Sequence, residues 1–406
     1  MSVIKVTFPE DRTTAERCLA SSLKSLEDVP VRSVGLFSGI GGLELGLGGA
    51  GIETELLCEY WEPAAATLRR RFEAPVVGDI RELAVLPDSD VVTAGFPCTD
   101  LSQVGRTAGI TGDESGLIRE VFRLVADSLP TWLVLENVPN MLTLHDGAPI
   151  HHITEWLDEN GWNWAYRTVD SQHFGVRQRR RRVFLVASQR EDPRGVLLAD
   201  EVDAPVARKR HSAYGFYWTE GNRGIGWGEG VTPTLKGGSK LGIASPPGVW
   251  IPGAEIGKAI CRPSIRAGER LQGFRAGWTE GAGKLGERWK MVGNAVTVPV
   301  AEWIGRRLVS PGEPLDVGRS VLTPGRRWPA AASSVAGKRE AWQLSERPIV
   351  VRPRMSLSAL LDRYSSEPLS LGATTGFTER LKASTLRRSD HFVTALDTHI
   401  TAMTTN

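Results

Sequence analysis

Short apolar runs recur along the first half of the chain and are separated by longer stretches with helical periodicity. Strand-length runs that alternate with helices indicate βαβ units and a mainly parallel sheet covered by helices on both faces. The last two runs follow each other closely, which favours an antiparallel pair that closes the edge of the sheet. The pattern therefore predicts an α/β fold. The runs occupy residues 34–37, 55–59, 74–80, 91–96, 132–138, 166–171 and 181–188.

The pattern changes on either side of this region. Residues 1–30 are mostly polar, and we interpret them as a leader before a first domain at 31–188. Glycine, proline and tryptophan are frequent over 189–283, which predicts a smaller, loop-rich second domain. Residues 284–309 regain apolar periodicity and should return to the first domain. The remainder, 310–406, is predicted to be a linker rich in Pro, Gly, Ser and Arg, followed by a helical extension.

Composition limits the class of protein. The chain has 406 residues, of which 41% are hydrophobic and 24% charged, as is usual for globular domains. A net charge of +2 says little about partners, because a balanced total can hide a local basic face. The first residues lack a basic region with a long apolar core, and no apolar run reaches 18 residues. We therefore expect a cytoplasmic protein that does not contact a membrane.

The four cysteines stand far apart in the sequence, at Cys18, Cys58, Cys98 and Cys261. Because there is no CxxC pair, neither a zinc site nor a dense disulfide framework is indicated, and no metal is expected. Cys98 follows the fourth predicted strand, in the stretch AGFPCTDLS. A free thiol there is either a small buried hydrophobe or a nucleophile, and its place at a strand end favours the nucleophile.

A glycine-rich turn follows the first predicted strand, in FSGIGGLELGL. Glycines at 39, 41 and 42 would let the backbone approach a ligand, and the helix that follows offers N–H groups to an anion. The spacing is not GxGxxG, so a tight connection without a ligand stays open. Glu59 and Asp79, at the ends of the next two strands, supply acceptors for a ribose and an exocyclic amine, as in an adenosine pocket. The alternative is two solvated loop acids.

Two further features belong to later strands. The fifth predicted strand ends in Glu136, which an apolar setting would keep partly protonated. The run QRRRR, residues 178–182, is the strongest local cluster of charge. A run of this kind is often a solvated face. On a strand, however, Arg180 and Arg182 would point to the same side as Gln178.

Together these residues resemble the DNA cytosine-5 methyltransferase family, of prokaryotic or phage type. The resemblance rests on six segments in the family's order: FSGIGGLELGL, GFPCTDLS, ENV, FGVRQRRRRVF, RLQGF and VGNAVTVPVA. It implies a Rossmann-like mixed sheet that binds S-adenosylmethionine as methyl donor, and a smaller target-recognition domain with DNA in the cleft between them. The leader and the chain from Ser310 onwards lie outside the resemblance.

The resemblance also implies the chemistry. Cys98 would add to C6 of a cytosine flipped out of the duplex, and this covalent step makes C5 able to accept a methyl group. Glu136 would hold N3 and the exocyclic amine of the base. Arg182 is expected near the O2 of the base, and Arg180 near a phosphate or the catalytic loop.

Cofactor and DNA contacts follow from the same resemblance. The implied cofactor contacts are Phe37, Gly39, Gly41, Glu59, Tyr60, Asp79, Pro97, Leu117, Asn294 and Val296. The first three should surround the methionine part, and the next three the ribose and adenine. The implied DNA contacts are Ser102 and Gln103 of a catalytic loop at 101–116, Gln178 and Arg180, and the pair Thr234 and Leu235 of the recognition domain.

The predicted function is methylation of carbon 5 of cytosine in a short, specific sequence of double-stranded DNA. The enzyme is expected to be a monomer that works beside a separate restriction endonuclease. One alternative is a tRNA cytosine-5 methyltransferase, which the basic recognition segment with its Thr-Leu pair disfavours. A second is an inactive binding protein, which the presence of Cys98, Glu136 and Arg182 disfavours. The chain departs from many relatives at Arg177 and Arg181, which replace a proline and an acid and add positive charge.

Overall fold

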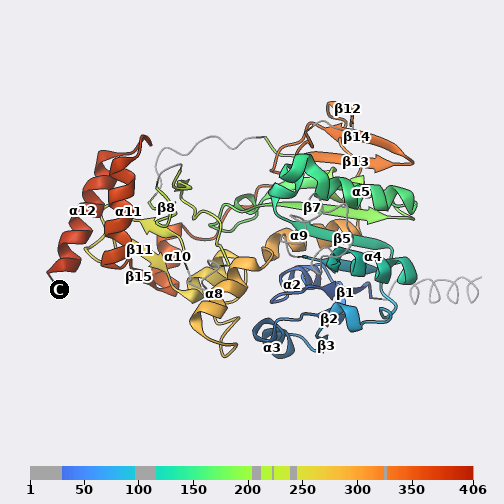
Figure 1. The fold of residues 1–406 in the computed structure, drawn as a ribbon, viewed down its shortest axis with the longest axis horizontal. Coiled ribbons are helices and arrows are strands. Elements are labelled where there is room, and N and C mark those ends of the chain that lie inside the picture. The colour runs from blue at the N-terminus through green and yellow to red at the C-terminus, as the bar shows by residue number, and fades with distance from the viewer. Residues whose placement is uncertain are drawn as a thin grey trace, which may run out of the picture.

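The computed structural model describes residues 30–96, 116–203, 212–221, 224–237, 245–323 and 327–405. The predicted leader and the segment that carries Cys98 lie outside these ranges. The described chain has two lobes, each built on its own β-sheet (Figure 1). The larger sheet is mixed and covered by helices, so the predicted α/β fold is confirmed. None of the described helices is long and apolar enough to cross a membrane.

The larger lobe is organised around a ten-stranded sheet in the order β12-β14-β13-β6-β7-β5-β4-β1-β2-β3. β4 and β5 are buried along their whole length, because both faces of the sheet are covered. β7 (Arg181–Ser188) runs antiparallel to β5 and to β6 (Asn163–Asp170), as the close spacing of the two runs predicted. The parallel strands are β1 (Arg32–Leu36), β2 (Glu53–Cys58), β3 (Val76–Val77), β4 (Val91–Ala94) and β5 (Trp132–Asn137).

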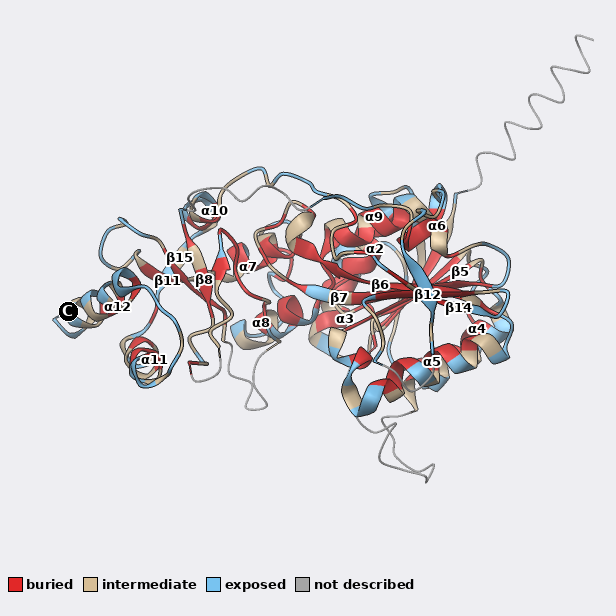
Figure 2. Ribbon diagram, turned by 90° about the horizontal axis from the view of Figure 1, so that it is seen from above, coloured by how far each residue is buried: buried red, intermediate tan, exposed pale blue. Residues whose placement is uncertain are grey.

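Helices pack on both faces of this sheet. α4 (Leu117–Ser128) and α5 (Ala148–Glu159) contribute apolar residues to the cluster on one face. α2 (Gly42–Gly48), α6 (Arg194–Leu197) and α9 (Val298–Val309) contribute to the cluster on the other face. The strands form the buried centre of the lobe (Figure 2). Because α9 packs directly on α2, this late segment belongs to the larger lobe.

Three strands extend the large sheet where the sequence predicted a linker. They are β12 (Arg319–Val321), β13 (Ala331–Val335) and β14 (Lys338–Trp342), and β13 pairs antiparallel with β6. The pair β6–β7 therefore does not close the edge of the sheet, which corrects the expectation drawn from the apolar runs.

The composition of β13 explains why this strand gave no apolar run. Its sequence is AASSV, and the small polar residues Ser333 and Ser334 occupy buried positions. The Trp342 Nε1–H donates a hydrogen bond to the Ser333 Oγ at 2.8 Å, which satisfies this hydroxyl in the interior. Small side chains with local hydrogen-bond partners therefore fill this buried strand. Because they are not strongly apolar, the sequence pattern did not predict it.

The smaller lobe has a five-stranded antiparallel sheet in the order β15-β11-β10-β8-β9. Its strands are β8 (Tyr214–Phe216), β9 (Gly228–Glu229), β10 (Gly248–Trp250), β11 (Ile260–Pro263) and β15 (Ser366–Pro368). Three C-terminal helices belong to the same part of the molecule: α10 (Leu357–Tyr364), α11 (Leu371–Ala383) and α12 (Asp390–Thr404). The helical extension predicted from the sequence is thus part of the smaller lobe (Figure 1).

Aromatic side chains form the core of the smaller lobe. The Phe216 ring of β8 packs against Phe377 of α11 and Phe392 of α12, with ring centroids 5.0 and 5.1 Å apart. Trp227 and Trp250 pack against Phe392 in the same cluster. Trp250 therefore belongs to the core of the smaller lobe, and the partly buried Trp227 packs against this core.

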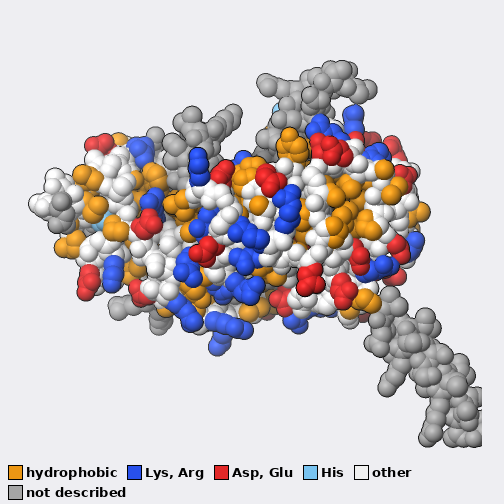
Figure 3. All heavy atoms as spheres, turned by 90° about the horizontal axis from the view of Figure 1, so that it is seen from below, with side chains coloured by type: hydrophobic (Ala, Val, Ile, Leu, Met, Phe, Trp, Pro, Cys, Tyr) orange, Lys and Arg blue, Asp and Glu red, His pale blue; other side chains and the backbone are white. Residues whose placement is uncertain are grey.

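A third cluster of buried residues joins the two lobes. It includes Ile40 from the glycine-rich turn and Leu235 from the smaller lobe, and α7 (Ile265–Leu271) and α8 (Leu285–Asn294) lie between them. The Trp278 Nε1–H donates to the Ile40 carbonyl at 2.9 Å across this junction. Lys and Arg side chains gather on the middle of one face of the molecule, where the lobes meet (Figure 3).

Candidate active site

The turn after β1 brings the backbone close to a late part of the chain. Phe37, Gly39 and Gly41 have φ angles of 54°, 57° and 79°, in the left-handed region that favours glycine. A Cβ on Gly42 would lie 2.5 Å from the Val296 carbonyl oxygen, so only glycine fits there. The structure therefore brings Val296 next to the turn, where the resemblance had placed both in one cofactor pocket.

Glu59, the residue after β2, ties its strand to this turn. Its Oε2 accepts a hydrogen bond from the Gly39 N–H and its Oε1 accepts one from the Trp61 N–H, both at 2.8 Å. Burial raises the pKa of Glu59, while these hydrogen bonds and the charge of Lys290 oppose the rise. Lys290 Nζ also lies 4.3 Å from the centroid of the Trp61 ring. The fold thus holds an acidic acceptor beside the glycine turn.

Tyr60 and Asp79, the other two residues predicted to contact the ribose and adenine, differ in their present partners. Tyr60 is 78% exposed, so its ring is open to a ligand. Asp79, after β3, pairs with Arg81 at 2.7 Å and also accepts a hydrogen bond from the Arg81 N–H. Hydrogen bonds from the Arg81 side chain and backbone lower the pKa of Asp79. An adenine amine would therefore have to share this carboxylate with Arg81.

The other described residues that were predicted to contact the cofactor include two at the ends of helices. Leu117 is the first residue of α4, and it is partly buried against the core cluster of the sheet. Asn294 is the last residue of α8, and its side chain lies against Gly237 of the smaller lobe. Asn294 therefore lies where the larger and the smaller lobe meet.

Glu136 and Arg182 form an ion pair at the carboxyl end of β5. The Arg182 Nε lies 2.9 Å from the Glu136 Oε1, and the two side chains are 14% and 9% exposed. The antiparallel ladder explains their proximity, because Glu136 pairs with Phe184, two residues beyond Arg182. A Cβ on Gly95 would lie 3.7 Å from the Glu136 Oε2, so the carboxyl borders the segment that leads to Cys98.

Asn137 was not predicted from the sequence. Its Nδ2 donates a hydrogen bond to the carbonyl of Phe96, the last described residue before the segment that carries Cys98, at 3.1 Å. A polar residue at the end of a fully buried strand needs such a partner, and this was the signal that the segment ENV offered. Four predicted site residues lie outside the described residues: Pro97, Cys98, Ser102 and Gln103.

Gln178 and Arg180 point into the protein. Both side chains are at most 2% exposed. Arg180 Nη1 donates to the carbonyls of Leu235 and Gly293, at 3.1 and 3.0 Å. Burial lowers the pKa of Arg180 well below its usual value, and the neighbouring charge of Arg182 lowers it further. The predicted alternation along this segment is present, but in this structure the two inner side chains contact protein and do not face a DNA surface.

The Thr-Leu pair of the smaller lobe docks on the same segment. The Thr234 Oγ1 donates to the Arg179 carbonyl at 3.0 Å, and the Tyr217 hydroxyl donates to the Thr234 carbonyl at 2.9 Å. Leu235 is 1% exposed, and its N–H donates to the Gln178 Oε1 at 2.7 Å. The two residues predicted to contact DNA thus connect the lobes to each other.

Glu44 and Cys58 are buried titratable groups near the turn, and no function was predicted for either from the sequence. Glu44 of α2 is 1% exposed and accepts a hydrogen bond from the Thr93 Oγ1 at 3.1 Å. Desolvation raises the pKa of Glu44 to about 7. Cys58 is 2% exposed, and its Sγ donates to the Gly78 carbonyl at 3.3 Å, so it packs in the core, where burial raises the pKa of its thiol to about 12.

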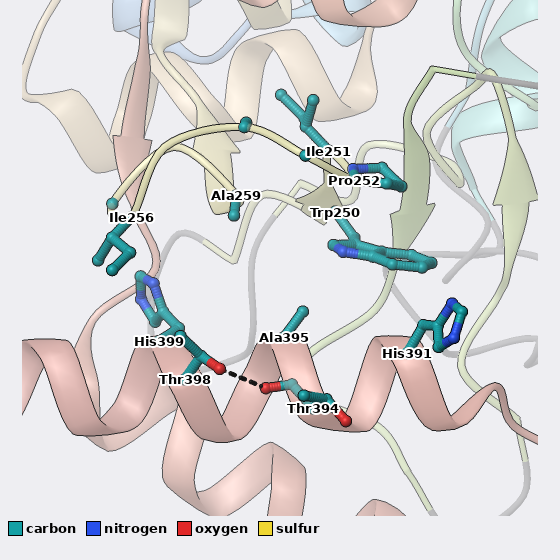
Figure 4. A pocket seen from close by; sticks show the side chains of 13 residues that line it. Trp250, Ile251, Pro252, Ile256, Ala259, His391, Thr394, Ala395, Thr398 and His399 are labelled. Atoms are coloured by element: carbon teal, nitrogen blue, oxygen red, sulfur yellow. Dashed lines mark hydrogen bonds between the residues drawn. The ribbon is translucent and has the colours of Figure 1, made fainter.

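A separate pocket of about 450 Å³ lies in the smaller lobe, between α12 and the segment that joins β10 to β11 (Figure 4). Trp250 and Ile256 line it, with His391 and His399 from α12. The His399 Nε2 is hydrogen-bonded to the Leu369 carbonyl at 2.7 Å. None of the predicted site residues lines this pocket, which lies at the end of the molecule away from β5 (Figure 1). The candidate active site is instead the edge where β1, β2, β4 and β5 end.

Comparison with known proteins identifies the family to which this chain belongs. The family described as C-5 cytosine-specific DNA methylase matches residues 31–214. The type II methyltransferase M2.BsuMI of Bacillus subtilis (strain 168) is 41% identical over 386 residues, which cover 90% of this chain and 97% of that protein. The chain therefore belongs to the C-5 cytosine-specific DNA methylases, and it is a DNA (cytosine-5)-methyltransferase.

Other similar proteins match a part of the chain or share its general fold. The type II methyltransferase M.Bsp6I of Bacillus sp. (strain RFL6) is 36% identical over a region that covers 37% of this chain and 50% of that protein. Among solved structures, the S. pombe Dnmt2 methyltransferase has a TM-score of 0.53 and 16% identity, and the match covers 69% of this chain and 98% of that chain. The structural likeness shows a shared fold.

Proposed function

We propose that this chain transfers a methyl group from S-adenosylmethionine to carbon 5 of a cytosine in a short, specific DNA sequence. The observation that carries the proposal is the Glu136–Arg182 ion pair at the end of β5, beside the segment that leads to Cys98. The turn that holds Gly39 against Glu59 lies at the same edge of the sheet, two strands further along. The carboxyl ends of parallel strands are where open α/β sheets bind their ligands.

The base needs covalent activation because C5 of cytosine is a poor nucleophile. In the proposed reaction the Cys98 thiolate forms a bond to C6 while N3 takes up a proton, and the resulting enamine is nucleophilic at C5. S-adenosylmethionine, when bound, supplies an electrophilic methyl group. Methyl transfer leaves S-adenosylhomocysteine. Loss of the C5 proton to a base then expels the Cys98 thiolate, and N3 returns its proton to the acid that supplied it, which restores the neutral aromatic ring. The enzyme is thereby returned to its starting state.

Glu136 is the group that would hold the proton at N3. Its ion pair with Arg182 fixes the orientation of the carboxyl before the base arrives, so little reorganisation is needed during the reaction. Because both side chains are mostly buried, removal of one would leave the other charge poorly solvated. We therefore assign Glu136 to the proton at N3 and Arg182 to the support of Glu136 and the base's O2.

The turn after β1 fits S-adenosylmethionine. Backbone without a side chain at Gly39 allows close approach of a ligand, and Glu59 beside it is an acceptor for ribose hydroxyls. The exposed ring of Tyr60 offers a surface for an adenine. These features support cofactor binding at the edge next to Glu136.

Two observations support binding of DNA: the positive charge on one face of the molecule and the similarity to a type II methyltransferase. Lys and Arg side chains gather on one face at the junction of the lobes, where they can bind phosphates and offset the cost of base flipping (Figure 3). A relative that covers nearly the whole chain is named a type II methyltransferase. We therefore place this enzyme in a restriction-modification system, beside an endonuclease that acts on the same sequence.

Mapping of 5-methylcytosine in the DNA of cells that express the chain tests activity and sequence together. We expect one short sequence to be methylated by the wild type and none by Cys98→Ser. DNA with 5-fluorocytosine in that sequence should trap a covalent complex that requires S-adenosylmethionine, because fluorine cannot leave as the C5 proton does. Trapping by Cys98→Ser, or methylation of tRNA in place of DNA, would reject the proposal.

A further inference from the structure

The two lobes meet along two extended segments that pair through their backbones. Residues 177–180, just before β7, lie beside residues 232–235 of the smaller lobe. The Thr232 N–H donates to the Arg177 carbonyl, and the Arg179 N–H donates to the Thr232 carbonyl, both at 2.8 Å. We call these two segments the lobe seam. Because backbone pairing fixes register, the seam sets how the recognition lobe is placed along β7.

Two side chains of the opposite segment of the lobe seam hold the peptide of Leu235. Its N–H donates to the Gln178 Oε1 at 2.7 Å, and its carbonyl accepts from the Arg180 Nη1 at 3.1 Å. All three residues are at most 2% exposed. Since water cannot replace a partner that is removed from such a buried site, each hydrogen bond resists displacement of Leu235.

Gln272 connects the lobe seam to the end of α8. Its Nε2 donates to the carbonyls of Val292 and Ala295, at 2.8 and 3.2 Å. Its Oε1 accepts from the Gln178 Nε2 at 2.9 Å and from the Thr297 Oγ1 at 2.8 Å. The side chain is fully buried, so one amide joins three parts of the chain that are distant in sequence.

The end of α8 is shared by the recognition lobe and the cofactor edge. A Cβ on Gly293 would overlap the Lys236 carbonyl, so the two lobes meet there backbone to backbone. A few residues later, the Val296 carbonyl lies against Gly42 of the glycine turn. A shift of the recognition lobe at the end of α8 is therefore a shift relative to the catalytic edge.

We propose that Gln178 and Gln272 are positioning residues that set where the recognition lobe presents its DNA relative to Glu136 and Cys98. The inference rests on the proposed function. Neither amide contacts a reacting atom, and both act through Leu235 and the end of α8. A displacement of about 1 Å at a reacting group costs roughly 100-fold in rate, so loss of this amide pair should slow methyl transfer while both ligands still bind.

Single-turnover methylation, measured together with binding of S-adenosylhomocysteine, separates positioning from ligand binding. Gln178→Met should lower the single-turnover rate by roughly tenfold or more, while the Kd for S-adenosylhomocysteine stays within about twofold of the wild type. Gln272→Met should also lower the rate, and the double variant should be no slower than the slower single variant, because the two amides act as one unit. Thr378→Val is the matched control: it removes a buried hydroxyl that bonds only within α11, and it should keep the rate.

A milder pair of variants keeps the test decisive should Gln178→Met not fold. Thr297→Val removes the hydroxyl that donates to Gln272, whereas Thr297→Ser retains it, so only the valine variant should be slower. Several results would overturn the proposal: a wild-type rate in Gln178→Met, a loss of S-adenosylhomocysteine binding in proportion to the rate, additive effects in the double variant, or equal rates for the two Thr297 variants. A wild-type chain that methylates no DNA would instead reject the proposed function.

Discussion

Three acids near the candidate site are stabilised in different ways, which sets what each can do. Glu136 has a guanidinium partner in Arg182. Glu59 accepts hydrogen bonds from two backbone N–H groups. Glu44 accepts a hydrogen bond from the neutral Thr93 hydroxyl, lies within the influence of the Glu59 charge, and is the most deeply buried of the three. Because a buried carboxylate without a cation is costly, Glu44 is the acid whose charge the fold tolerates least.

Glu44→Gln should change how stability depends on pH. The pKa of Glu44 is raised from 4.5 to about 7, so the folded state keeps this proton over a pH range in which the unfolded state loses it. The free energy of unfolding of the wild type should therefore fall as the pH rises from 4.5 towards 7, by about 3 kcal/mol from this group. The glutamine variant should lack this contribution to the pH dependence of the free energy of unfolding. Urea unfolding near the two ends of this range measures it, and an identical pH dependence in both proteins would contradict the raised pKa.

Glu136→Gln should slow the chemical step and leave cofactor binding intact. An amide cannot deliver a proton to N3, and loss of such a group typically costs about 100- to 10,000-fold in rate. Single-turnover methylation with saturating DNA and S-adenosylmethionine measures this effect. Binding of S-adenosylhomocysteine is the control, because Glu136 lies outside the glycine turn. A rate within roughly tenfold of the wild type would remove Glu136 from the proposed role.

At the scale of elements, apolar runs predicted the strands of the parallel half but not those that follow Ser310. Strands such as β4 and β5 are buried on both faces, so their sequences are nearly continuously apolar. β13 is built from small residues, and its partner β6 lies far away in the sequence. Local patterns carry no information about such a partner, and the strand was therefore missed.

The candidate site also combines features that follow from local sequence patterns with features that depend on distant parts of the chain. The glycine turn and the inward side of Arg180 and Arg182 follow from strand ends and alternation, which are local rules. The burial of Gln178 and Arg180 depends on Leu235 and on the end of α8, which reach the site from elsewhere in the chain. Local rules therefore did not predict that Gln178 and Arg180 hold the lobes together.

Trp342→Ala tests whether the strands after Ser310 are integral to the large lobe. Trp342 is 3% exposed and donates to Ser333, so its loss leaves a cavity and a buried hydroxyl without a partner. The free energy of unfolding should fall by about 3–5 kcal/mol. Val321→Ala, at a site on β12 that is 78% exposed, is the control and should change it by about 0.5 kcal/mol at most. Equal urea midpoints for the two variants would mean that this extension adds nothing to stability.

At the scale of the whole molecule, charge and packing both point to the junction of the lobes. The formal net charge is only +2, yet Lys and Arg side chains gather on one face at this junction (Figure 3). The same region contains the cluster that includes Ile40 and Leu235. A basic face that crosses a packed junction would let DNA contact both lobes at once, as the proposed function requires.

Phe392→Ala should separate the contributions of the two lobes. Phe392 is 1% exposed, and its ring lies 5.1 and 5.3 Å from those of Phe216 and Trp250 in the core of the smaller lobe. The cavity should destabilise that lobe by about 3–5 kcal/mol and lower DNA methylation as the lobe unfolds. Binding of S-adenosylhomocysteine should persist, because the glycine turn and Glu59 belong to the larger lobe. In thermal unfolding, S-adenosylhomocysteine should then raise the midpoint temperature of the larger lobe alone.

A single unfolding transition, at which ligand binding and methylation are lost together, would instead mean that the lobe seam makes the two lobes one cooperative unit.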